Sequence, residues 1–105
     1  MYTHVVMFTL PDPEDIPGTV RTLAGMEGRI PQIRYLEVGV DDSPSARSAH
    51  ILLVTRFDSK EAMQVYQEHP HHRHVLEHLK EVEVRAVKVD YKEPVVAVVP
   101  SIDSD

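Results

Sequence analysis

The chain has 105 residues, of which 42% are hydrophobic and 27% charged, so we expect one soluble domain with one modest core. Its formal net charge of −6 at pH 7 argues against nucleic acid or an anionic membrane as the partner. The absence of cysteine excludes disulfides, a thiolate nucleophile and cysteine-ligated metal, and no segment resembles a signal peptide or a membrane span, so we expect a cytoplasmic protein.

The first half of the chain predicts a strand, a helix and a second strand. Residues 2–10 are rich in β-branched and aromatic side chains, which favour an extended conformation. Residues 14–27 place four apolar side chains at helical spacing: Ile16, Val20, Leu23 and Met26. Residues 33–41 alternate between two faces, so a second strand is expected after the helix.

The second half predicts a third strand, two consecutive helices and a fourth strand. Residues 49–57 form the third strand, and a helix N-cap follows at residue 58 or 59. Because Pro70 disfavours a helical residue before it, one helix ends near Glu68 and the next begins with Pro70 in its first turn. Residues 82–91 form the last strand. The order βαββαβ is the ferredoxin-like arrangement of the α+β class.

The strands at residues 2–10 and 49–57 are apolar on both faces. Helices in this arrangement cover only one face of the sheet, and a face that meets water is normally polar. The bare apolar face therefore predicts that a second copy packs sheet against sheet, which gives a homodimeric α/β barrel. We expect four side chains on that face: Val5, Met7, Ile51 and Leu53.

A valine-rich run between two prolines occupies residues 94–100. Its composition favours pairing with an edge strand, and that strand could belong to the partner subunit. The alternative is an ordered arm that packs on its own subunit. Both interpretations remain open from the sequence.

Five of the seven histidines lie between residues 66 and 79. The helix that begins at Pro70 has one face defined by i, i+3, i+4 and i+7 spacing: His72, Val75, Leu76 and Leu79. The imidazole of His72 is therefore expected to point toward the core. The other face is expected to meet water and carries the other three helical histidines: His71, His74 and His78. Their spacing could hold a divalent metal, but a solvated helical face is the favoured interpretation, so no metal site is predicted.

Four segments together resemble the stress-responsive dimeric α/β-barrel (Dabb) family: residues 4–8, 30–33, 57–62 and 66–72. The resemblance extends over residues 2–91. It assigns residues 1–93 to a Dabb domain and residues 94–105 to a C-terminal tail. It implies the βαββαβ monomer and the sheet-on-sheet dimer that the strand pattern predicts independently.

Within that family, the chain is similar to the polyketide cyclases of the olivetolic acid cyclase type. The resemblance places the histidine of their His-Pro-x-His motif on His72 and the tyrosine six residues earlier on Tyr66. It also matches their first-strand histidine with His4 and the histidine that opens the third strand with His50. Strand parity puts His4 and His50 on the helix-facing side, so we expect all four side chains to meet between sheet and helices.

These four side chains predict acid–base chemistry without a cofactor. A neutral imidazole at His72 can take a proton from a carbon between two carbonyls, while the Tyr66 hydroxyl holds the oxygen on which charge develops. The alternative is that both are core side chains with satisfied hydrogen bonds.

Three functions follow from these alternatives. The leading expectation is a small, largely apolar ligand bound between sheet and helices. A cofactor-independent cyclase or lyase is the second, and a structural or stress-associated homodimer without a ligand is the third. Five further side chains are expected to line the ligand: Val6, Phe8, Leu52, Met63 and Leu76.

Overall fold

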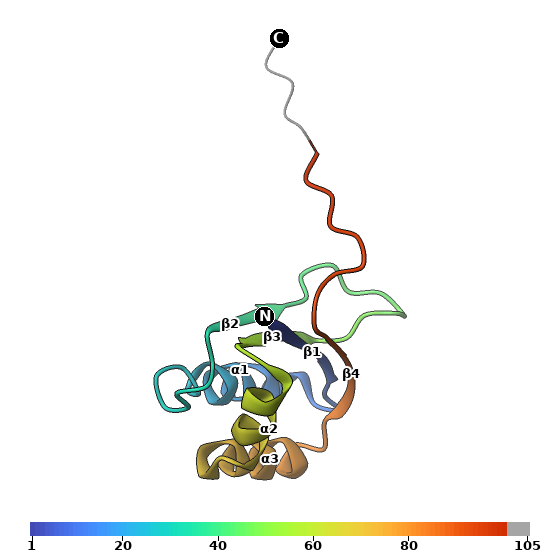
Figure 1. Ribbon diagram of the computed structural model, residues 1–105. Helices are drawn as coiled ribbons and strands as arrows, with labels where there is room; N and C mark the ends of the chain where they lie inside the picture. Colours follow the sequence, from blue (N-terminus) through green and yellow to red (C-terminus); the bar gives the residue numbers. More distant parts are fainter. Residues whose placement is uncertain (101–105) are drawn as a thin grey trace.

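Four antiparallel strands form a sheet whose one face is covered by helices (Figure 1). The computed structural model describes residues 1–100, and the strand order in the sheet is β2-β3-β1-β4. The strands are β1 (Tyr2–Thr9), β2 (Tyr35–Val40), β3 (Ile51–Phe57) and β4 (Arg85–Tyr91). The helices are the short 3₁₀ helix η1 (Pro13–Asp15), α1 (Ile16–Ala24), α2 (Lys60–Glu68) and α3 (Pro70–Glu81). This order confirms the predicted ferredoxin-like α+β fold.

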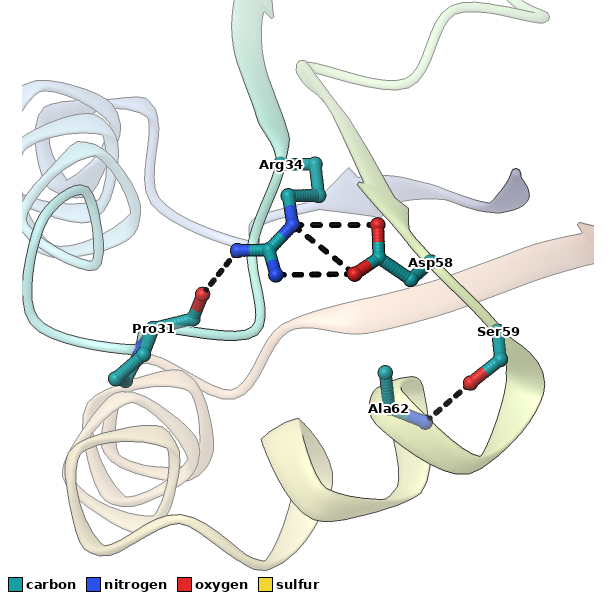
Figure 2. Close-up of polar contacts among 5 residues, drawn as sticks. All are labelled: Pro31, Arg34, Asp58, Ser59 and Ala62. Atoms are coloured by element: carbon teal, nitrogen blue, oxygen red, sulfur yellow. Dashed lines mark hydrogen bonds and ion pairs between the residues drawn. The ribbon is translucent and has the colours of Figure 1, made fainter.

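His69 separates α2 from α3, as the position of Pro70 predicts. Its φ of −64° and ψ of 139° are extended, the conformation that a residue before proline favours. Its ring Nδ1 accepts a hydrogen bond of 3.0 Å from the His71 backbone N–H, so the same residue caps the new helix. At the start of α2, Ser59 Oγ accepts from the Ala62 N–H at 3.1 Å (Figure 2). Among residues 1–100, no helix is long and apolar enough to cross a bilayer.

Arg34 ties the segment before β2 to the segment after β3. Figure 2 shows its guanidinium between the carbonyl of Pro31, at 2.8 Å, and the carboxylate of Asp58, at 3.0–3.2 Å. Both charged side chains are at least half exposed, so solvent screens the pair and it adds little to stability. Its geometric effect is to hold the ends of the two neighbouring strands together.

The core lies between the helix-facing side of the sheet and the helices. β1 and β3 bury every second residue there, as strand geometry requires, and supply five apolar side chains: Val6, Phe8, Ile51, Leu53 and Phe57. The helices supply five more: Leu23, Met63, Tyr66, Val75 and Leu79. The fold is therefore organised around one contiguous core.

The open face of the sheet corrects the register expected from the sequence. Ile51 and Leu53 are only 2% exposed beneath the helices, so placing them on the open face was wrong. The central strands present Val5 and Met7 there, as expected, and Leu52 and Val54 take the places of Ile51 and Leu53. Both faces of β3 are apolar, so alternation alone could not tell whether its odd-numbered or even-numbered residues face the helices. Choosing the wrong set moves every side chain of the strand to the other face of the sheet.

The tail leaves the body of the molecule beyond β4 without joining the sheet (Figure 1). Its four valines at residues 95, 96, 98 and 99 are 74–100% exposed. Residues 94–100 therefore do not pack as an arm on their own subunit. Pairing with a partner subunit stays a prediction, and residues 101–105 lie outside the described part of the chain.

Glu83 ends α3 in a backbone conformation that favours glycine. Its φ is +57°, and two backbone hydrogen bonds of 3.1 Å, from Glu83 N–H to Lys80 and from Val84 N–H to Leu79, close a Schellman motif. We expect Glu83→Gly to stabilise the fold by about 1 kcal/mol, because the left-handed conformation penalises a side chain. Urea denaturation measures the change.

The matched control is Glu81→Gly, two positions earlier and inside α3. Glycine there should destabilise by about 1 kcal/mol, because it loses helix propensity. A lower urea midpoint for Glu83→Gly would show that its side chain makes a compensating interaction.

Candidate functional site

A cavity of about 420 Å³ lies between the sheet and the two C-terminal helices. β1 contributes Val6 and Phe8 to its wall, and α3 contributes Val75, Leu76 and Leu79. The cavity opens toward the edge of the sheet that β4 forms. Exposed residues of β4 and α3 border it there. The wall is largely apolar with a few polar side chains, which is the usual make-up of a small-molecule site.

Tyr66 and His72 face each other across the break between α2 and α3. Their ring centroids are 4.6 Å apart in an edge-to-face arrangement, and both side chains line the cavity. The His4 ring, on β1, lies 6.3 Å from the Tyr66 ring and lines the same cavity. Among the residues that the structure describes, the Tyr66 hydroxyl makes only a long contact of 3.8 Å with Met26 Sδ. Three of the four residues proposed for chemistry are therefore brought together.

The His72 imidazole is held neutral and incompletely hydrogen-bonded. Burial lowers its pKa, and the backbone of Gln67 offsets part of that effect. Its Nδ1 is buried and has no hydrogen-bond partner within residues 1–100. Burial also raises the pKa of Tyr66, so its hydroxyl keeps its proton. A neutral acceptor thus lies beside a proton donor in one cavity.

His4 is oriented by Asp90, a residue that the sequence interpretation missed. Asp90 Oδ1 lies 2.5 Å from His4 Nδ1, and Asp90 Oδ2 accepts from Lys88 Nζ at 2.6 Å. Burial alone would raise the pKa of Asp90, but the hydrogen bonds from Lys88 and His4 outweigh it and the pKa is lowered. The carboxylate is therefore ionised, and His4 Nδ1–H donates to it, which fixes the tautomer and orientation of the His4 ring.

The comparisons with known proteins agree with this fold. The family model described as "Stress responsive A/B Barrel Domain", or Dabb, matches residues 2–93. The chain belongs to the Dabb family. No curated protein matches it.

Solved structures similar to this Dabb chain share its fold. A dimeric protein of unknown function with a ferredoxin-like fold from Bacteroides fragilis is 25% identical, with a TM-score of 0.77 over 88% of this chain and 95% of that chain. A dimeric ferredoxin-like protein of unknown function from Thermobifida fusca is 22% identical, with a TM-score of 0.75 over 86% and 88%. A protein from Arabidopsis thaliana is 23% identical, with a TM-score of 0.77 over 93% and 100%.

His50 lies outside the cavity of the Dabb domain, so its predicted position was wrong. It precedes β3, and its ring Nδ1 accepts a hydrogen bond of 2.9 Å from the Leu10 N–H. It borders a separate hollow with Met7 and Leu52. On β1 the even-numbered residues, including His4, face the helices, whereas on β3 the odd-numbered residues do, so His50 and Leu52 lie on the other side of the sheet from His4.

The other residues expected around a ligand divide into two groups. Val6, Phe8 and Leu76 line the cavity, as expected. Met63 packs in the core and Leu52 lies on the open face, so neither borders the cavity.

The outer histidines of α3 are not equivalent. His78 is hydrogen-bonded through Nε2 to Thr19 Oγ1 at 2.9 Å, so it joins α3 to α1 and its predicted orientation toward water was wrong. His74 is largely exposed and lies 3.8 Å from Glu77, and His71 is partly buried. Within residues 1–100, no three histidine, aspartate or glutamate side chains are grouped to hold a metal ion.

Proposed function

We propose that this Dabb chain binds a small, largely apolar molecule in the cavity between α3 and the sheet. The observation that carries the proposal is the cavity itself, whose volume of about 420 Å³ falls within the range of small-molecule sites. Tyr66 and His72 support it further, because they add polar groups to an otherwise apolar wall, as small-molecule sites typically have.

We also propose that the functional unit is a homodimer. The open sheet face carries apolar side chains with high exposure, including Met7 at 45% and Val87 at 62%. A second sheet packed on this face would remove them from water. The similar structures from Bacteroides fragilis and Thermobifida fusca are both described as dimeric, which supports the same arrangement.

Leu76→Trp tests the cavity. Leu76 lines it and is about half exposed, so a larger ring there should occupy its opening while the core stays intact. We expect the affinity for 1-octanol, measured by calorimetry, to fall about tenfold, the effect of excluding roughly two methylene groups.

The control for that test is Val65→Trp on α2. Val65 is exposed to the same degree and does not border the cavity, so octanol binding should not change. Equal affinity in both variants would place the ligand elsewhere. Wild-type protein that binds no apolar ligand would favour a structural dimer without a ligand.

A cofactor-independent polyketide cyclase or lyase is the second candidate, favoured by the pairing of His4 with ionised Asp90 beside Tyr66 and His72. In this mechanism, neutral His72 removes a proton from a carbon between two carbonyls, and the Tyr66 hydroxyl donates a hydrogen bond to the oxygen that gains charge. The resulting carbon nucleophile attacks a third, more distant carbonyl of the same chain, and the proton held by His72 passes to the oxygen formed there. The resemblance of the sequence at Tyr66 and His72 to the motif of cyclases of the olivetolic acid cyclase type, from which this candidate arose, is in keeping with it.

A further inference from the structure

The charges around the cavity differ in sign from the protein as a whole. The chain has a formal net charge of −6, yet within residues 1–100 no aspartate or glutamate borders the cavity. The charged side chains in the wall are two lysines, Lys80 from α3 and Lys88 from β4. Both are exposed, so their ammonium groups lie at the opening while the interior is apolar.

The two lysines differ in what balances their charge. Lys88 donates to Asp90 at 2.6 Å, and this interaction raises the pKa of Lys88. Lys80 takes part in none of the ion pairs found within residues 1–100. Of the two lysines at the opening, Lys80 is therefore the one without an ion-pair partner among residues 1–100.

The distance from Lys80 into the cavity indicates the shape of a matching ligand. Lys80 lies just over two helical turns after His72, which is about 12 Å along the axis of α3. Between them, Val75, Leu76 and Leu79 form a continuous apolar wall. A molecule that fits this wall has an apolar body and one anionic group at the end that faces solvent.

We propose that the ligand is an amphiphilic carboxylate whose head group pairs with Lys80 and whose apolar chain extends toward His72. This inference rests on the proposed ligand-binding function and adds the chemical class of the ligand. A carboxylate accepts hydrogen bonds from an ammonium group, whereas an alcohol of the same chain length lacks the charge.

The test compares octanoate with 1-octanol by calorimetry at pH 8 and low salt. Wild-type protein should prefer octanoate, and Lys80→Gln should weaken octanoate binding about fivefold, the scale of a partly exposed charge pair. Lys80→Gln should leave octanol binding unchanged, and Lys80→Arg should keep the preference. Lys60→Gln, at the start of α2 and away from this cavity, is the matched control and should change neither affinity.

The possible results separate the two proposals. If octanol binds as tightly as octanoate and Lys80→Gln alters neither affinity, the carboxylate class is wrong while the binding cavity stands. If neither compound binds the wild-type protein, the proposed binding function fails as well. If Lys80→Gln weakens both compounds equally, Lys80 supports the cavity and does not select the head group, which also overturns the inference.

Discussion

Met7→Asp is expected to convert the proposed homodimer into a monomer or an aggregate. Met7 lies at the middle of the open face, between Leu52 of β3 and Val87 of β4, and is 45% exposed in the single chain. A carboxylate there costs the monomer little, but a dimer would bury two of them without partners. The dissociation constant should rise by more than about a hundredfold, and sedimentation velocity measures it.

Val65→Asp is the matched control for the dimer. Val65 has a similar exposure of 50% but lies on α2, on the helix-covered side of the sheet, so the mass of the assembly should not change. Leu53→Asp is not informative, because Leu53 belongs to the core and its substitution would unfold the chain. A dimer of unchanged mass for Met7→Asp would exclude the open face as the interface.

His72→Ala is expected to abolish cyclisation if the chain is a cyclase. With a linear β-polyketone as substrate, loss of the general base should lower kcat about 10²- to 10⁴-fold. In the wild type, burial lowers the pKa of His72, so activity should persist below about pH 6.5, the ordinary histidine value, and fall as pH drops through the lowered pKa. The sign follows because protonated imidazole cannot accept a proton.

Two further variants separate roles within the site. Tyr66→Phe removes one donor and keeps the ring, so its effect on kcat should be smaller than that of His72→Ala. Asp90→Asn should lower kcat by releasing the His4 ring from a fixed tautomer. His74→Ala, whose ring is 75% exposed, is the control and should leave turnover unchanged. If His72→Ala only destabilises the fold and the wild type never accelerates the reaction, these residues are structural.

The sequence predicted those parts of the molecule that depend on local signals. Pro70 sets the break between two helices, and helical spacing was enough to direct His72 toward the core. The pairing of Tyr66 with His72 was implied by the family resemblance, and the break brings the two rings together. The presence and order of the strands followed in the same way from composition and turns, with limits that differ by at most three residues from those observed.

The features that the sequence missed depend on contacts between distant segments. The parity of β3 relative to β1 is set by strand pairing, and two apolar faces give no local sign of it, which misplaced His50 and Leu52. The link from His78 to Thr19 depends on packing of α3 against α1. Asp90 stands beside His4 only because β4 pairs with β1, although the polar residues at alternate positions of β4 were a usable signal.

The hydrogen bond between His4 and Asp90 connects residues 86 positions apart, from the first strand to the last. During synthesis, His4 leaves the ribosome early and has no partner until nearly the whole domain has followed. Within residues 1–100, β4 pairs only with β1, and it also supplies one wall of the cavity. A nascent or clipped chain that ends before β4 therefore has neither an oriented His4 nor a closed site. Ligand occupancy would therefore distinguish completed chains from truncated ones, and a ligand that fits the site would selectively protect the completed chains from degradation.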